Sequence, residues 1–148
     1  MTMPLTVNDT LWPKCRKLPA NGGLVRGLRV LVAEDDEFVR DLLSIILGKE
    51  GMTVTAVDDG QAAVDAATAQ DFDLILMDMR MSGMGGFEAT RRIRRLESGS
   101  YLSPIIALTG NRTDHEISQC QRAGMNAHIG KPFRQEQLMS TIRATLFE

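Results

Sequence analysis

Short apolar runs alternate with longer amphipathic stretches along most of this chain. Five of the runs have the length of β-strands, and they cover residues 28–33, 52–57, 74–77, 105–108 and 127–129. The first, third and fourth runs are almost entirely apolar, which is typical of parallel strands buried on both faces. Apolar residues recur at helical spacing between and after the runs, for example at Leu138, Ile142 and Leu146. This alternation predicts a doubly wound α/β fold with a five-stranded parallel sheet and right-handed crossovers.

Charge and cysteine content narrow the classes of function. The 148 residues carry a formal charge of −2, which gives no overall reason to bind nucleic acid or an anionic membrane. The four arginines among residues 91–95 have no aromatic residues between them, so we interpret them as a solvated helix face. Cys15 and Cys120 match no metal or redox spacing and predict free thiols. With no bilayer-spanning run and no signal-peptide pattern, we expect a cytoplasmic protein without nucleic-acid or membrane partners.

The first 27 residues differ from the remainder of the chain. They contain several prolines, among them Pro4 and Pro13, a basic cluster and two adjacent glycines, and they show no helix or strand period. We therefore predict a flexible tail or linker over residues 1–27 and one domain over residues 28–148. Two alternatives stay open, because Trp12 and Leu11 could dock on the domain, and the segment could equally be the remnant of a junction to another domain.

Polar side chains follow four of the five predicted strands. Glu34 and Asp35 come after the first strand, and Asp78 comes after the third. Thr109 follows the fourth strand, and Lys131 follows the fifth. Because doubly wound sheets bind ligands beyond the carboxyl ends of their strands, we expect these side chains to converge there. Each residue alone is more often a solvated turn or surface group, and only the ordered set predicts a site.

The chemistry of this set favours a metal ion and a phosphoryl group. Carboxylates brought together from two strand ends repel each other, and a hard divalent cation offsets that repulsion. Mg²⁺ prefers oxygen ligands in octahedral geometry, which Asp35 and Asp78 could provide, and Mn²⁺ is an alternative. An aspartate carboxylate can attack phosphorus to give an acyl phosphate, in a reaction that depends on positioning and charge neutralisation. Lys131 would add positive charge, and Thr109 could donate to a phosphate oxygen.

At these positions the sequence resembles the response-regulator receiver family of two-component signalling, and most closely receivers associated with hybrid sensor histidine kinases. The resemblance covers about residues 28–147, and the stretches that carry it are 30–36, 74–81, 104–109 and 131–133. It implies a flavodoxin-like fold with strand order 2-1-3-4-5. It also implies a phosphoryl group donated by a phosphohistidine of a kinase or phosphotransfer protein, and a downstream protein target. The output would be a shape change on the face of the fourth helix, fifth strand and fifth helix.

The resemblance implies a role for each acid. Asp78 matches the phosphoacceptor and Asp35 matches the direct metal ligand. Glu34 matches the second acid, which acts through water. Arg80 stands where the family supplies a backbone carbonyl to the metal, so the implied metal set is Glu34, Asp35, Asp78 and Arg80. The side chains of Arg80 and Asn111 flank the site, and we expect them to tune the lifetime of the acyl phosphate.

The remaining implied roles concern the switch and the lysine. Thr109 matches the switch hydroxyl, and His128 occupies the place of the switch aromatic, where it is smaller than the common tyrosine and can titrate. Lys131 matches the lysine that contacts the phosphoryl group, and the peptide bond before Pro132 is expected to be cis. Glycines at positions 83, 85 and 86 predict a loosely held loop after Asp78.

Two rival classes of function use similar residues. An aspartate-nucleophile phosphatase of the haloacid dehalogenase type carries an acid two residues after its nucleophile, whereas this chain has Arg80 there. Steady turnover of a phosphomonoester would favour that phosphatase, and one-time labelling would favour a receiver. A scaffold that no longer accepts phosphate is disfavoured by the intact acids, Thr109 and Lys131. No glycine-rich nucleotide loop is present. We expect a protein that promotes its own phosphorylation and dephosphorylation and is not a turnover enzyme.

Overall fold

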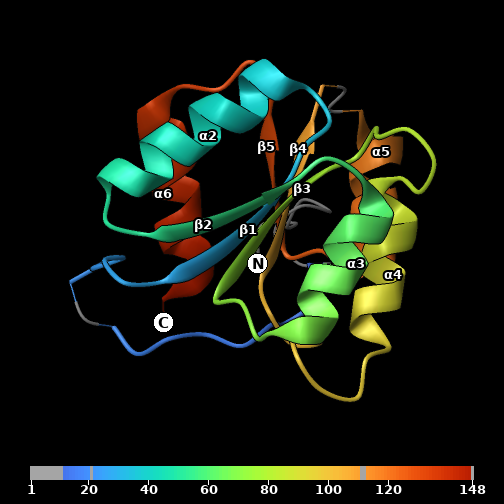
Figure 1. Ribbon diagram of the computed structural model, residues 1–148, viewed down its shortest axis with the longest axis horizontal. Helices are drawn as coiled ribbons and strands as arrows, with labels where there is room; N and C mark the ends of the chain where they lie inside the picture. The colour runs from blue at the N-terminus through green and yellow to red at the C-terminus, as the bar shows by residue number, and fades with distance from the viewer. Residues whose placement is uncertain (1–11, 21, 111–112, 148) are drawn as a thin grey trace, which may run out of the picture.

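Strands and helices alternate along the chain in a computed structural model that describes residues 12–20, 22–110 and 113–147 (Figure 1). The strands are β1 (Arg29–Ala33), β2 (Thr53–Val57), β3 (Leu74–Asp78), β4 (Ile105–Thr109) and β5 (Ala127–Gly130). The helices are α2 (Glu37–Lys49), α3 (Gly60–Ala69), α4 (Gly86–Arg94), α5 (Asp114–Ala123) and α6 (Gln135–Leu146). Each strand is followed by a helix, as the alternation of apolar runs predicted.

The five strands form one parallel sheet in the order β2-β1-β3-β4-β5, which confirms the predicted fold class and strand order. Helices α2 and α6 cover one face of the sheet, and α3, α4 and α5 cover the other (Figure 1). The chain passes from β1 outward to β2 and then returns across β1 to β3. A crevice is expected at such a change of direction, beyond the carboxyl ends of β1 and β3.

Each face of the sheet has its own hydrophobic core. On the side of α2 and α6, Leu43, Leu47 and Ile142 pack against the strands. On the other side, small residues of α3 such as Ala63 and Ala67 let that helix approach the sheet closely. All residues of β3 and β4 are buried. Because burial of one large apolar side chain stabilises a fold by about 1.5–3 kcal/mol, the positions of these strand ends are firmly set.

The described residues of the segment 12–27 pack against the domain. They run along the amino ends of the strands, at the bottom of Figure 1. Leu18 forms a parallel bridge with Phe147, and Val25 is buried in the core on the side of α2 and α6. Trp12 docks on the domain by stacking on His128, whereas Leu11 lies outside the described residues.

None of the helices in the described ranges combines the length and the apolar character needed to cross a lipid bilayer.

Candidate functional site

The carboxyl ends of the strands bring the predicted site residues to one edge of the sheet. Asp78 is the last residue of β3, and Thr109 is the last residue of β4. Glu34 directly follows β1 and Lys131 directly follows β5. Strand register aligns these ends, since Asp78 pairs with Leu108 and Thr109 is paired to the residue before Lys131. Four segments that are far apart in sequence therefore end beside each other.

Three acids gather at this edge. Glu34, Asp35 and Asp78 each offer a carboxylate oxygen, and the three oxygens lie within 4.8 Å of one another. The side chains differ in their surroundings, because Glu34 is fully buried, Asp78 is 4% exposed and Asp35 faces solvent. Asp36 follows Asp35 and caps the start of α2. Its carboxylate accepts hydrogen bonds from the first backbone N–H groups of that helix, and the bond from Phe38 is 2.9 Å long. This helix cap holds the turn that carries Glu34 and Asp35.

Lys131 is the one basic side chain with a described ion pair to these acids. Its Nζ lies 2.6 Å from Oε1 of Glu34 and 3.3 Å from Oδ1 of Asp78. The ammonium is thus the close charged partner of the buried Oε1 of Glu34. Partial burial lowers the pKa of Lys131, but the two carboxylates outweigh burial and the pKa is raised. The peptide bond between Lys131 and Pro132 is cis, as predicted.

Asp78 is the acid whose protonation is most perturbed. Burial, together with a hydrogen bond to Glu34 and the charge of that neighbour, raises the pKa of Asp78 to about 6. Lys131 and the backbone N–H of Arg80, which is 3.2 Å from Oδ1 of Asp78, act in the opposite direction. A carboxyl group with a strongly raised pKa in a cleft is typical of a functional site, because its charge is incompletely compensated by the protein.

The donors at this edge fit a hard divalent cation. Three carboxylates, two of them buried, face one ammonium. Oxygen-only donors with excess negative charge are what Mg²⁺ requires. The predicted contribution of the Arg80 carbonyl stays a prediction. The side chain of Arg80 is largely exposed and reaches Glu116 of α5, with 3.4 Å between Nη2 and Oε2.

The two predicted switch residues lie on neighbouring strands. Thr109 is buried at the end of β4, whereas His128 in β5 is partly exposed. The ring of His128 stacks on Trp12, with 5.6 Å between the ring centroids and 21° between the planes. The switch roles of Thr109 and His128 stay predictions, and Asn111 lies outside the described residues.

Two residues, one beside the site and one at the opposite end of the sheet, act differently from what the sequence indicated. Gly86 was expected to loosen the loop after Asp78, yet it is buried, and a Cβ there would overlap the carbonyl oxygen of Asp78. Glycine at this position permits close packing of α4 on the end of β3. Arg94 was expected on a solvated face, yet its side chain is partly buried and donates four hydrogen bonds. No pattern in the sequence separates Arg94 from its exposed neighbours Arg91 and Arg92.

Comparisons with known proteins point to one family. Residues 30–143 match the family described as the response regulator receiver domain. The chain is 35% identical to histidine kinase 1 of Arabidopsis thaliana, over 80% of this chain and 13% of that protein. It is also 35% identical to the CAI-1 autoinducer sensor kinase/phosphatase CqsS of Vibrio cholerae, over 78% of this chain and 17% of that protein. The chain thus spans less than a fifth of the length of these curated relatives.

Solved structures give the same result. The receiver domain of a sensor histidine kinase from Pseudomonas aeruginosa is 38% identical, with a TM-score of 0.74 over 80% of this chain and 97% of that one. That protein holds a magnesium ion coordinated in its active site cleft. Chemotaxis protein CheY4 of Vibrio cholerae is 29% identical, with a TM-score of 0.77 over 81% of this chain and 99% of that one.

Proposed function

This chain belongs to the response regulator receiver domain family, and on that premise we propose that it accepts a phosphoryl group from a phosphohistidine onto Asp78. The donor would be a histidine kinase or a histidine phosphotransfer protein. The observation that carries the proposal is the setting of Asp78, whose carboxylate lies beside the buried acid Glu34, shares the ammonium of Lys131 with it, and has a pKa raised to about 6.

Asp78 would act as the nucleophile. An oxygen of its carboxylate attacks phosphorus, the bond from phosphorus to the donor imidazole breaks, and the electron pair of that bond stays on the imidazole nitrogen. Asp78 must be ionised for this attack, and a pKa of about 6 leaves it mostly ionised near neutral pH. Lys131 already contacts the carboxylate, so its ammonium is well situated to contact an oxygen of the arriving phosphoryl group.

Glu34, Asp35 and Asp78 are the residues that would hold Mg²⁺ or Mn²⁺, with the Arg80 carbonyl as a fourth ligand. When bound, the ion supplies positive charge that neutralises the acids and the phosphoryl oxygens. The protein contributes the fixed positions of the acids, since burial of Glu34 and the helix cap at Asp36 hold them at the strand end.

The signal would pass through Thr109. Its hydroxyl would donate to an oxygen of the acyl phosphate, and this new bond would draw Thr109 and then His128 towards the site. The output face would be formed by α5, β5 and α6, which correspond to the fourth helix, fifth strand and fifth helix of the sequence prediction. A kinase, a phosphotransfer protein or a downstream target would bind there.

A groove beside the site would receive the phosphodonor protein. The groove has a volume of about 320 Å³, and its lining includes Phe38, Leu42, Lys131 and Phe133. Phe38 is 74% exposed, which is unusual for an aromatic side chain one turn from a buried acid. Exposed apolar side chains that border a reactive group are typical of a protein-binding surface. This surface would bring a donor histidine close to Asp78.

The test is labelling with acetyl phosphate and Mg²⁺, followed by intact-mass measurement. The wild-type protein should gain one phosphoryl group, and Asp78→Asn should gain none. Asp65→Asn serves as the matched control, because Asp65 is an exposed acid of α3 bonded to Gln61 and should leave labelling unchanged. Labelling of Asp78→Asn at the wild-type level would contradict the proposal, and steady hydrolysis of a phosphomonoester would favour the phosphatase class instead.

A further inference from the structure

A segment that lies outside the predicted domain binds the face that carries the proposed switch residue. This segment, residues 12–18, crosses the amino end of the sheet and reaches the edge strand β5. It is anchored in its middle by Arg16, whose guanidinium donates to both carboxylate oxygens of Asp71 at 2.8 and 2.9 Å and to the carbonyl of Phe72 at 2.8 Å. A bidentate arginine–carboxylate pair fixes direction as well as position.

Both flanks of this anchor are bonded to the domain. On one flank, the backbone N–H of Leu18 donates to the carbonyl of Leu146 at 2.7 Å. On the other flank, the carbonyl of Pro13 accepts from the side-chain amide of Asn126 at 2.8 Å. Asn126 directly precedes β5, so this bond holds the segment beside the start of that strand. The segment is therefore held as an ordered strap over these residues.

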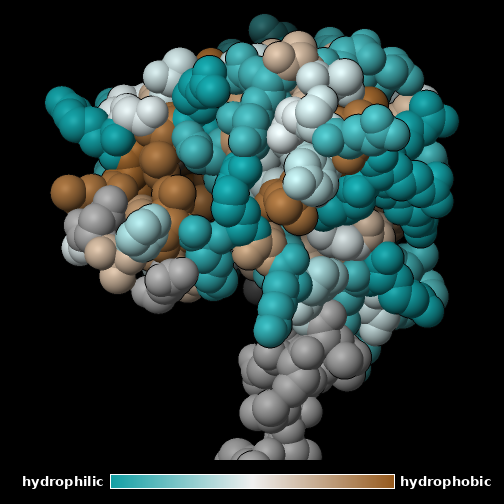
Figure 2. Space-filling model, turned by 90° about the horizontal axis from the view of Figure 1, so that it is seen from below, coloured by the Kyte–Doolittle hydropathy of each residue, from teal (hydrophilic) through white to brown (hydrophobic). Residues whose placement is uncertain are grey.

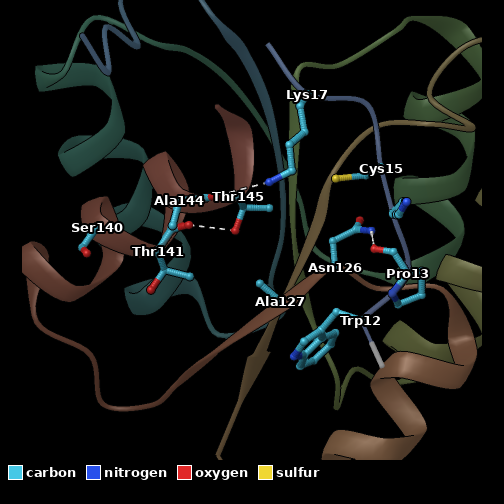
Figure 3. Close-up of a pocket in the computed structure, with 11 residues that line it drawn as sticks. Trp12, Pro13, Cys15, Lys17, Asn126, Ala127, Ser140, Thr141, Ala144 and Thr145 are labelled. Atoms are coloured by element: carbon cyan, nitrogen blue, oxygen red, sulfur yellow. Dashed lines mark hydrogen bonds between the residues drawn. The ribbon is translucent and has the colours of Figure 1, made fainter. Parts of the chain in front are cut away.

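The segment and α6 form the two walls of a groove. Figure 3 shows Pro13, Cys15 and Lys17 on one side and Thr141 and Ala144 on the other. The groove has a volume of about 570 Å³, and Lys17 extends across it to the carbonyl of Ala144 at 3.4 Å. The strap thus occupies one side of the surface formed by α5, β5 and α6.

The contact closest to the switch is made by Trp12. Its ring stacks on His128, the second residue of β5. Strand β5 pairs with β4, where Ala107 is the partner of His128 and Thr109 is the partner of Gly130. In the proposed switch, His128 would follow Thr109 towards the site, and that movement would break its stack on Trp12.

We propose that residues 12–18 are an intramolecular occupant of the α5–β5–α6 surface and that phosphorylation of Asp78 releases Trp12 from His128. This inference rests on the proposed function. Release would free the surface at β5 for a protein partner, so the strap and the partner compete. Thermodynamic reciprocity requires that a strap weakened by phosphorylation also opposes phosphorylation. Loss of one aromatic stack should therefore ease formation of the phosphorylated state by about two- to tenfold.

The first experiment uses Trp12 as its own probe, because it is the only tryptophan of the chain. Acetyl phosphate and Mg²⁺ are added to the full chain, and acrylamide quenching of tryptophan emission and intact mass are measured on the same sample. Quenching should rise in proportion to the phosphorylated fraction, since a released ring is open to solvent. Mg²⁺ alone should leave quenching unchanged. In Thr109→Ala, compared at the same phosphorylated fraction, the rise should be absent.

The result also separates the two proposals. If Asp78 gains a phosphoryl group and quenching of Trp12 stays constant, the strap proposal is wrong while the proposed function stands. If Asp78 gains no phosphoryl group, both are wrong.

A second experiment measures the reciprocal effect. In Trp12→Ala, the acetyl phosphate concentration that gives half-maximal labelling should fall by about two- to tenfold. Lys14→Ala is the matched control, because Lys14 is exposed on the same segment, and it should label as the wild type does. Equal labelling of Trp12→Ala and wild type would overturn the coupling between the strap and the site.

Discussion

The two ends of the central sheet differ in how completely their polar groups are paired. At the amino end, Arg94 of α4 donates from its guanidinium to the carbonyls of Gly124, Tyr101 and Ser103 and to the side-chain oxygen of Asn126, at 2.7 to 3.0 Å. Burial lowers the pKa of Arg94 to about 10, which still leaves the group charged at neutral pH. Figure 2 shows this end from below, covered mostly by hydrophilic side chains, with hydrophobic surface gathered towards α2 and α6.

At the carboxyl end, pairing is incomplete. Glu34 is fully buried and shares the ammonium of Lys131 with Asp78, and the pKa of Asp78 is raised to about 6. Lys131 provides one positive charge for three acids. The comparison indicates that one end of the sheet stabilises the fold, whereas the other end retains charge that a metal ion and a phosphoryl group can neutralise.

The largest expected effect is at the amino end. Arg94→Ala removes the donor of four hydrogen bonds, of which only the oxygen of Asn126 keeps another described donor, the amide of Ile105, and we expect the free energy of unfolding in urea to fall by about 3–5 kcal/mol. Arg92→Ala on the same helix is the control, because Arg92 bonds to Glu88 at the surface, where ion pairs contribute little. Equal destabilisation by the two variants would contradict the proposed stabilising role of the amino end.

The second prediction concerns the sign of the effect at Asp78. The folded pKa of about 6 lies above the ordinary aspartate pKa of 3.8, so the folded state binds the proton more tightly than the unfolded state does. The contribution of Asp78 to the unfolding free energy of the wild type should therefore fall as pH rises from about 4 to about 6. Asp78→Asn has no carboxyl group to ionise, so its unfolding free energy does not fall in this way. Near neutral pH we expect it to exceed that of the wild type by about 1–2 kcal/mol, a figure reduced for solvent screening.

Urea unfolding without divalent metal at about pH 7.5 and about pH 4.5 checks this prediction. The difference between Asp78→Asn and wild type should shrink at the lower pH, where Asp78 is protonated in both states. A stabilising effect of Asp78→Asn that is larger at low pH would have the wrong sign for a carboxyl group with a raised pKa.

The third prediction concerns metal binding. Mg²⁺ at ten times its dissociation constant should raise the unfolding free energy by about 1.4 kcal/mol relative to protein in EDTA. The gain should be smaller near pH 5, because protonation of Asp78 removes one ligand charge. Asp35→Asn should weaken the gain, and Asp65→Asn, far along α3, should not. An equal gain in both variants would indicate nonspecific ion binding.

The smallest expected effect concerns the groove beside the site. Phe38→Ala should slow phosphoryl transfer from a protein donor by several-fold, about 1 kcal/mol, because an aromatic contact is lost. Labelling by acetyl phosphate should not change, since this small donor does not need the groove. Leu24→Ala removes an exposed apolar side chain at the opposite end of the sheet and should affect neither reaction. Slower labelling by both donors would instead indicate damage to the acid cluster.

Local patterns in the sequence determined the architecture and most of the candidate site. Strands and helices were readable because burial imposes a period on neighbouring residues. The convergence of Glu34, Asp78 and Lys131 followed from that architecture, since parallel strands end at the same edge.

Only the tertiary structure decided how individual side chains are paired. Arg94 and Arg92 are equivalent in the sequence, yet one is bonded across more than 30 residues and the other stays at the surface. The stack of Trp12 on His128 and the close packing of Gly86 on Asp78 have no local signal either. The spacing of apolar residues indicates which face of a segment is buried. Which polar side chains bond to each other depends instead on which distant groups the fold brings within a few ångströms.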